Sequence, residues 1–468
     1  MTPAEHTHQK DALRTLLQEL IAYARRNGIT AELLLRAEDS SLIRFANSAI
    51  SLNTSEQTIT LSIAAHWKNA RGTYTLVTNL ASVAEMKRAI HVADEIAHHA
   101  VPPSYTQRVT PLPPFADDDP FFDPALIAMT AQQKLDYVNR AAAGLECDGV
   151  SLAGMFSSGA VWEATANSLS DTVLVHATTD AHVSLVLSHE RLKWEVASSQ
   201  SATRMPDLQP EAVHAELAVL LGEYRKQPPM RMPLGACDVV FGREALGDLL
   251  SFAVMLGFDG GACKRKMTFL QEEQLGAKHF SAQFTLTDDP RVRETFPYRF
   301  DLNGIERRPF PLVEQGVFKQ FMWDRDSADE FGQTETGHSV PHVSMVMAPG
   351  TAAVASLPEA LAMPRERDTL YVPFIHYMNV VNETKGLVTG SSRFGALLLA
   401  QDGAIRVPYN VRITDAFFNL FGNIAWLSAA QAAVNTSSTY GERNPTALLV
   451  PRFALVNGVQ ITHANDTY

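Results

Sequence analysis

Residues 150–199 read VSLAGMFSSGAVWEATANSLSDTVLVHATTDAHVSLVLSHERLKWEVASS. Apolar and polar residues alternate along most of this stretch, which is the period of a β-strand whose two faces differ in environment. A helical pattern over Ala128–Gly144 precedes it, and further strand patterns follow. Strand-rich sequence with helices at intervals favours antiparallel sheets with helices packed on them, because a repeating β-α-β order is missing. We therefore expect an α+β fold.

The flanking sequence extends this pattern in both directions. The N-terminal hundred residues predict a helix over Asp11–Asn27, then short strands, then a helix over Leu80–Ala100. The Pro-rich stretch 101–124 cannot continue a helix or a central strand and is predicted to be an ordered connector. With 468 residues the chain exceeds the roughly 300 residues that one core supports. We predict an N-terminal α+β domain over 1–220 and a C-terminal antiparallel, β-rich domain over 221–468.

Composition limits the function classes. The net charge is −12, and no strongly basic cluster offers a surface that would neutralise phosphates, so direct nucleic-acid binding is not expected. The three cysteines are too few for a disulfide framework and suit a reducing compartment. The polar N-terminus lacks the apolar core of a signal peptide, and no run is long enough to span a membrane. These features predict a cytoplasmic protein that does not enter membranes.

Histidine spacing indicates no standard zinc-protease helix. Such a helix needs two histidines one turn apart with a glutamate beside the first. The only His-Glu pair, His189-Glu190, has no second histidine at that spacing and lies in a strand pattern. An atypical metal site built from His338, His342 and the distant His376 stays open as the alternative, although Pro341 excludes a helix between the first two.

A polar cluster occupies one face of a predicted strand. His176, Asp180 and His182 are separated by even numbers of residues, so their side chains share a face. An antiparallel sheet commonly exposes one face to water, and we expect these residues on that solvent-facing side.

Several short motifs follow one another in the C-terminal half. They include Asp288-Asp289-Pro290, Phe300-Asp301 with Gly304, Val388-Thr389-Gly390 and Arg393-Phe394-Gly395-Ala396. Each is weak alone, but about ten such elements occur in the same order as in one protein family. The chain resembles the TldD/PmbA family, specifically the PmbA (TldE) type, which has also been called modulator of DNA gyrase.

This resemblance implies a fold and a different role for each of two subunits. In the family, an N-terminal α+β domain precedes a C-terminal domain of curved antiparallel sheets, and two chains enclose a chamber for peptide cleavage. The TldD-type subunit supplies a His-Glu-x-x-x-His helix and a remote cysteine to bind zinc, whereas the PmbA-type subunit lacks them. The corresponding helix here, Arg243–Gly257, has no histidine. The resemblance thus implies a non-catalytic subunit of an intracellular metallopeptidase, inactive alone and without its own zinc, that pairs with a TldD-type catalytic subunit or forms a homodimer.

The resemblance also suggests where peptide substrates bind. It places the segment from Thr389 to Ala396 at the chamber wall, and glycine permits close approach of a peptide backbone. The predicted substrate-binding residues are Thr389, Gly390, Ser391, Arg393 and Gly395. Two other functions stay open. One is an autonomous hydrolase with a metal site from the three histidines named above or Cys263, and the other is a binding or regulatory protein.

Overall fold

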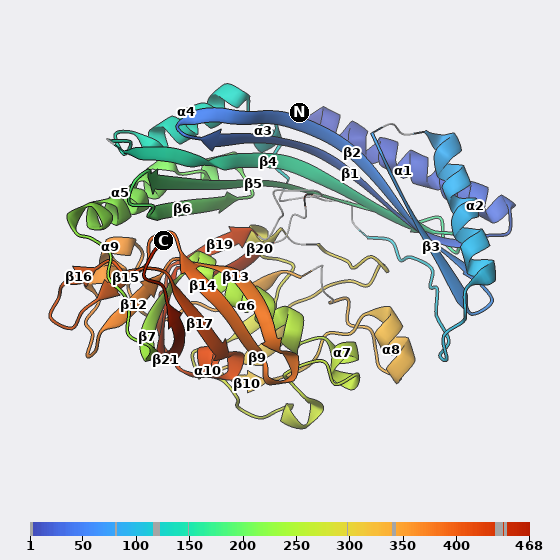
Figure 1. The fold of residues 1–468 in the computed structure, drawn as a ribbon. Coiled ribbons are helices and arrows are strands. Elements are labelled where there is room, and N and C mark those ends of the chain that lie inside the picture. Colours follow the sequence, from blue (N-terminus) through green and yellow to red (C-terminus); the bar gives the residue numbers. More distant parts are fainter. Residues whose placement is uncertain are drawn as a thin grey trace.

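The computed structural model describes residues 3–79, 82–115, 122–147, 149–296, 298–338, 343–435, 443 and 447–468. Its N-terminal part is one long, curved, six-stranded antiparallel sheet with the order β3-β2-β1-β4-β5-β6 (Figure 1). The strands are β1 (Thr30–Ala46), β2 (Ala49–Trp67), β3 (Ala70–Thr78), β4 (Val150–Asn167), β5 (Val173–His189) and β6 (Glu195–Ala202). We call this the N-terminal sheet.

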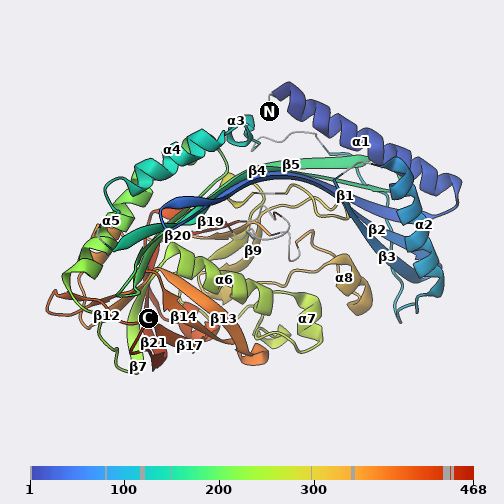
Figure 2. The same cartoon turned by 45° about the horizontal axis from the view of Figure 1, so that its top comes forward.

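Helices cover the convex face of the N-terminal sheet, as both views show (Figures 1 and 2). They are α1 (Pro3–Arg26), α2 (Val83–His99), α3 (Pro124–Ile127), α4 (Ala131–Ala142) and α5 (Pro210–Lys226). The apolar residues of the strand alternation point to them: Leu35 and Trp162 pack under α1 and α2, and Leu185 packs under α4 and α5. The helices predicted over Asp11–Asn27 and Leu80–Ala100 are present as α1 and α2. The apolar residues of the alternating pattern therefore face these helices, although long parts of β4 and β5 are buried on both faces.

The opposite, concave face is not exposed to water, and this corrects the expectation for His176, Asp180 and His182. His176 is 6% exposed and Asp180 is fully buried, because the C-terminal half of the chain covers this face. Asp180 Oδ2 accepts hydrogen bonds from Asn435 Nδ2 at 2.8 Å and from the Arg443 guanidinium at 2.6 Å. The alternation correctly indicated a polar face of the strand. This face contacts Asn435 and Arg443 of the C-terminal half, and not water as expected.

The C-terminal part contains two further sheets. The smaller has the order β10-β9-β8-β11-β20-β19, and the larger runs β13-β14-β17-β21-β7-β12-β15-β16 with β18 paired to β21. Most pairs are antiparallel, but β11 with β20 and β7 with β12 are parallel. The smaller sheet comprises β8 (Leu286–Asp288), β9 (Phe310–Glu314), β10 (Val317–Phe318), β11 (Met345–Met347), β19 (Gln431–Asn435) and β20 (Ala447–Pro451). The larger comprises β7 (Gly235–Gly242), β12 (Thr369–Val372), β13 (Phe374–Asn382), β14 (Leu387–Arg393), β15 (Leu397–Leu399), β16 (Ile405–Arg406), β17 (Val411–Ala416), β18 (Ile424–Leu427) and β21 (Phe453–Ala464).

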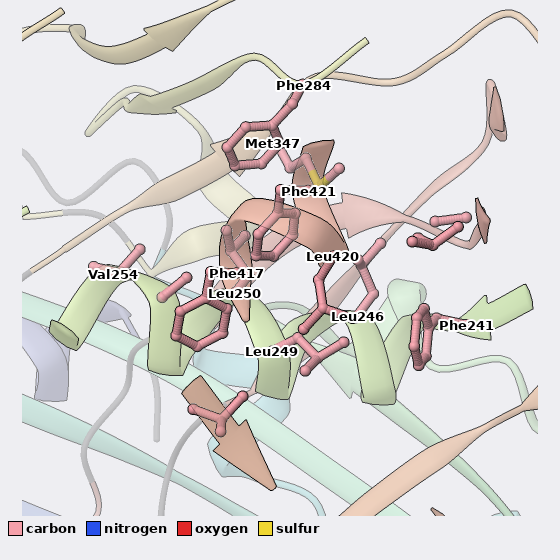
Figure 3. Packing of buried hydrophobic residues seen from close by; sticks show 14 of the residues in the cluster. Phe241, Leu246, Leu249, Leu250, Val254, Phe284, Met347, Phe417, Leu420 and Phe421 are labelled. Atoms are coloured by element: carbon pink, nitrogen blue, oxygen red, sulfur yellow. The ribbon is translucent and has the colours of Figure 1, made fainter. Parts of the chain in front are cut away.

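Helix α6 (Arg243–Gly257) runs through the middle of the C-terminal core. The other helices of this part are α7 (Gly260–Lys264), α8 (Arg325–Phe331), α9 (Leu357–Ala362) and α10 (Phe417–Gly422). Figure 3 shows Leu246 and Leu250 of α6 in one packed cluster with aromatic residues of α10 and with Phe241 of β7. This packing fixes α6 and hence the direction in which its first turn points. The α+β class with packed helices is confirmed.

The connector is ordered over its described portion. Residues 101–115 contain no helix or strand, yet the Asn69 side chain donates to the carbonyl of Tyr105 at 2.6 Å, and the Arg108 side chain bonds Asp329. Residues 116–121 lie outside the described part. Among the described helices none is both long and apolar enough to cross a bilayer.

Candidate functional site

A cavity of about 420 Å³ lies where the N-terminal sheet meets the smaller C-terminal sheet. Its walls are the end of β6, the start of α5, the first residue of α6, the 3₁₀ turn Arg293–Thr295, β19 and the end of β20. Both β6 and β19 are terminal strands of their sheets in the described part of the chain. They lie side by side, since the backbone N–H of Asn435 donates to Ser201 Oγ at 2.9 Å. The cavity is therefore bordered by two strand edges.

A carboxylate between two guanidinium groups forms one wall. Arg243 donates to both oxygens of Glu216, at 2.6 and 2.8 Å, and Arg452 donates to Oε1 at 3.0 Å. Ser198 adds a fourth hydrogen bond at 2.6 Å. Arg243 also donates to the carbonyl of Ser199 at 2.6 Å, which ties α6 to the β6 edge. Such bidentate, charge-assisted pairs hold both position and orientation.

Burial and the neighbouring charges act in opposite directions on the pKa values of this wall. Burial alone would raise the pKa of Glu216, but the charge and hydrogen bonds of Arg243 outweigh it and lower the pKa to about 2. Burial and the nearby charge of Arg243 lower the pKa of Arg452 from its usual value, and Glu216 only partly compensates. Two guanidinium groups therefore share the carboxylate of Glu216, and Glu244 lies 3.7 Å from Arg243 as a second acidic neighbour.

A third arginine faces the same cavity. Arg293 Nη2 lies 3.0 Å from Glu294 Oε1 and 3.4 Å from Asp207 Oδ2. Its Nε, like the Nε of Arg452, is buried and has no hydrogen-bond partner among the described residues. Buried donors without a partner are rare in folded proteins, so each of these two N–H groups costs free energy in the folded state.

Behind this wall, the first turns of α6 meet the concave face of β5. Glu244 accepts a hydrogen bond from the Ser199 hydroxyl, and Asp248 lies one turn further along the helix. Burial and the charge of Glu244 raise the pKa of Asp248 to about 8. Burial lowers the pKa of His182, against the opposing effect of Glu244, and its Nδ1 has no partner among the described residues. Burial therefore disfavours the charged forms of both Asp248 and His182.

The first turns of α6 carry a motif that the sequence reading missed. Arg243, Glu244 and Asp248 have the spacing of His-Glu-x-x-x-His, with arginine and aspartate at the two histidine positions. A guanidinium has only donors and cannot bind a cation, and this one is held by Glu216. No group of three His, Cys, Asp or Glu residues in the described ranges could hold a metal. The residues present at this helix therefore do not fit a zinc ion.

The residues predicted to bind substrate lie on β14 and just after it. Thr389 bonds Thr414 at 2.9 Å on the neighbouring strand, and Ser391 lies opposite β13 and β17 in the larger sheet. A side chain at Gly390 would meet Ile375 at 2.4 Å, so close packing alone requires this glycine. Their role in substrate binding stays a prediction.

The end of this segment contacts β6 and α5, and none of its residues lines the cavity. Arg393 donates to Glu195 at the start of β6 at 2.7 Å. Gly395 adopts a φ of +116° and lies against Leu220 of α5. The lining residues Glu216 and Arg452 carried no recognisable signal, because they are 236 positions apart in the chain.

The alternative metal residues lie in different surroundings. His338 is 2% exposed, stacks on Phe310 and bonds Asp288 at 2.6 Å through Nδ1, and Asp288 is also paired with Arg307. His376 lies on β13 of the larger sheet. His342 lies outside the described residues. The alternative site is thus not assembled by the residues that the structure describes.

Comparisons with known proteins agree with the sequence resemblance. Residues 234–463 match the family model described as the PmbA/TldA metallopeptidase C-terminal domain. An uncharacterized protein of Methanocaldococcus jannaschii is 30% identical over 114 residues, which is 23% of this chain and 27% of that protein. The match therefore spans about a quarter of the curated relative's length. The resemblance to the TldD/PmbA family is confirmed.

Solved structures share the fold over nearly the whole chain. TldE from Thermococcus kodakarensis has a TM-score of 0.77 at 15% identity and covers 95% of this chain and 99% of its own. Two proteins with the label modulator of DNA gyrase are similar. The one from Thermotoga maritima has a TM-score of 0.75 at 15% identity, covering 96% and 100% of the two chains. The one from Bacteroides thetaiotaomicron has a TM-score of 0.76 at 18% identity, covering 97% and 99%.

Proposed function

From a chain whose C-terminal half matches the PmbA/TldA metallopeptidase C-terminal domain, we propose a non-catalytic subunit of a two-chain peptidase. It binds a TldD-type partner, which holds the zinc, and it forms part of the chamber wall that holds the peptide. A homodimer is the alternative assembly. The three cysteines are free thiols, which suits work in the reducing cytoplasm.

One observation carries this proposal. At the helix that carries His-Glu-x-x-x-His in the TldD-type subunit, this chain has Arg243 and Asp248, and Arg243 is held in a bidentate ion pair with Glu216. Replacing a metal-binding imidazole by a paired guanidinium removes a ligand and adds a positive charge. In this proposal the helix has a structural role in this chain, and the partner subunit binds the zinc ion.

The cavity supports the peptide-holding part of the proposal. It is bordered by β6 and β19, two strands that end their sheets in the described part of the chain. An exposed strand edge binds an extended peptide through main-chain hydrogen bonds, largely independently of sequence. A chamber that handles several peptides needs this kind of contact.

Metal content and activity test the non-catalytic role. We expect the purified chain to contain well under one zinc per molecule by elemental analysis and to cleave no peptide alone. Mixing it with a TldD-type partner should produce cleavage that neither chain shows by itself. One tightly held zinc that is lost on His338→Ala or His342→Ala would contradict the proposal.

Assembly is a separate test. Terminal strands of sheets favour association with another chain, so we expect the protein not to sediment as a monomer with its partner present. Sedimentation velocity at micromolar concentration should show a shift when the partner is added. A stable 51.3 kDa species that is unchanged by the partner would contradict the heterodimer, and a species of twice that mass without partner would favour the homodimer.

A further inference from the structure

The first half of β2 has a free edge. Residues 59–67 of β2 pair with β3, whereas residues 49–58 pair with β1 alone among the described strands. This free edge lies on the side of the N-terminal sheet that is away from β6 and the C-terminal half (Figure 1). A strand segment of this length spans about 33 Å. It offers a row of main-chain donors and acceptors to another strand.

The sequence of this edge lacks the usual protection. Residues 49–58 read AISLNTSEQT, with Glu56 as the single charge and no lysine or proline. Ile50 and Leu52 are 51% and 43% exposed, and none of residues 49–58 is buried. Natural edge strands are commonly blunted by lysine, proline or a covering segment, because a bare edge pairs with other chains. These features indicate an edge that another strand covers.

The edge is also held in place before anything pairs with it. The turn between β1 and β2 consists of Asn47 and Ser48, which both have a positive φ, as a tight two-residue hairpin requires. The backbone N–H of Ser48 donates to the carbonyl of Leu152 at 2.9 Å, and the Ser48 hydroxyl accepts from the Leu152 N–H at 3.1 Å. These bonds fix the hairpin end to β4, so pairing with a second strand costs little ordering entropy.

The charge pattern suits the same edge of a second copy. A two-fold axis pairs two identical strands in antiparallel fashion, with the same contacts made twice. Centred on Asn53, this pairing sets Glu56 opposite Ile50 of the other copy. Centred on Thr54, it sets Glu56 opposite Leu52. Like charges directly opposite one another destabilise a strand pair, and neither arrangement brings the two glutamates together.

We propose that residues 49–58 of β2 pair antiparallel with the same residues of a second copy of this chain, around a two-fold axis near Asn53 and Thr54. The two N-terminal sheets then form one continuous sheet across the dimer. A closed two-fold pairing occupies both β2 edges, so association through this edge stops at two copies. The inference goes beyond the proposed function, because it requires no TldD-type partner.

Sedimentation velocity of the full-length chain alone tests the pairing. At micromolar concentrations we expect a species of twice 51.3 kDa. The double variant Asn53→Lys/Thr54→Lys sets lysine opposite lysine in either arrangement, and it should weaken the dimer at least about tenfold. Leu169→Lys/Leu192→Lys is the matched control, because it adds the same charge at two turn positions that are 47% and 55% exposed. This control should leave the dimer unchanged, and circular dichroism checks the fold of both variants.

A disulfide locates the axis. Directly opposite residues of an antiparallel pair have Cα atoms about 4.5 to 5.5 Å apart, a distance that a disulfide spans. Asn53→Cys and Thr54→Cys are made separately and oxidised mildly, and at least one of them should form a covalent dimer on a non-reducing gel. The wild type, with its three free cysteines, and Arg308→Cys at a 78% exposed position are the controls and should stay uncrosslinked.

Each other outcome would overturn the proposal. A monomer at micromolar concentration does so, including one that associates only after a TldD-type chain is added. A dimer that the β2 lysine variant leaves intact, or that both lysine variants weaken equally, shows that the interface is not this edge. The absence of a disulfide at both positions excludes the two-fold pairing, and so does a series of species larger than a dimer.

Discussion

At the scale of single residues, the first turns of α6 carry an arginine and an aspartate whose environments differ. Arg243, Glu244 and Asp248 have the spacing of His-Glu-x-x-x-His but include no histidine. Arg243 is stabilised by Glu216, whereas Asp248 has no hydrogen bond or ion pair that the structure describes. Burial and Glu244 raise its pKa to about 8, so Asp248 is protonated in the folded protein at neutral pH.

Asp248→Asn tests this protonation. In the unfolded chain the carboxyl ionises near its ordinary pKa of 3.8, whereas in the folded chain it ionises near 8. Its contribution to stability is present below pH 3.8 and is lost as pH rises toward 8, by at most about 1.4 kcal/mol per pH unit. Urea unfolding at pH 5, 6, 7, 8 and about 9 should show the variant gaining stability over the wild type as pH rises, and the gain should level off above pH 8.

The control for this measurement is Asp171→Asn, because the Asp171 side chain is 95% exposed. Its stability difference from the wild type should stay nearly constant with pH. A constant difference for Asp248→Asn as well would show that Asp248 is ionised in the folded protein.

At the scale of elements, α6 approaches β19 closely because it has glycine at the contact. A Cβ on Gly247 would lie 2.8 Å from the Cγ1 of Val434, and Val434 is 3% exposed. This contact sets the distance between the helix that begins at Arg243 and the strand that borders the cavity. Glycine inside a helix costs about 1 kcal/mol relative to alanine, so its presence here reflects packing.

Gly247→Ala should destabilise the protein by about 1 to 2 kcal/mol, because overlap with Val434 outweighs the gain in helix propensity. In the background of Val434→Ala the same substitution should cost at least about 1 kcal/mol less, which a double-mutant cycle of unfolding free energies measures. Gly222→Ala in α5 is the control. A Cβ there meets nothing within 4 Å, so this variant should be more stable than the wild type. Additive costs at Gly247 and Val434 would contradict the close contact.

At the scale of the whole molecule, ion pairs join the N-terminal sheet and the connector to the C-terminal half. Arg325, which is 5% exposed, lies 3.0 Å from Glu32 of β1 and 3.2 Å from Glu335. Arg71 of β3 pairs with Asp326 at 2.5 Å, and Arg108 of the connector pairs with Asp329. All of these ion pairs involve residues of α8 or residues close to it in the chain. This short helix therefore links the N-terminal sheet and the connector to the C-terminal half (Figure 1).

Arg325→Ala should lower the free energy of unfolding by about 3 to 5 kcal/mol, because it leaves two partly buried carboxylates without their cation. Urea denaturation followed by both tryptophan fluorescence and circular dichroism measures the loss and shows whether the two halves still unfold together. Arg308→Ala is the matched control. Arg308 is 78% exposed beside Glu306, so its loss should cost no more than about 1 kcal/mol. A small effect of Arg325→Ala would show that packing alone joins the two halves.

The correct sequence predictions concern local periodicity. The predicted stripe of Leu13, Leu17 and Leu20 on α1 is buried, because contacts along one helix face repeat every turn. On α2, Met86 and Ile90 of the predicted stripe are buried, whereas Val92 and Ile96 are 36% and 41% exposed. The prediction for His176, Asp180 and His182 was wrong about the environment. A polar strand face looks the same in sequence whether water or Arg443 and Asn435 lie opposite it.

What the sequence determined by itself, then, is the α+β class, the faces of its strands and helices, and the family of its C-terminal half, because these depend on short-range periodicity and on motif order. Only the tertiary structure decided the cavity. It brings Arg243 of α6 and Arg452, which follows β20, onto the carboxylate of Glu216 in α5. These two arginines lie 27 and 236 residues from Glu216 in the chain. The physical reason is that a charge pair across such distances depends on how the sheets pack, and the pattern around each residue does not record that packing.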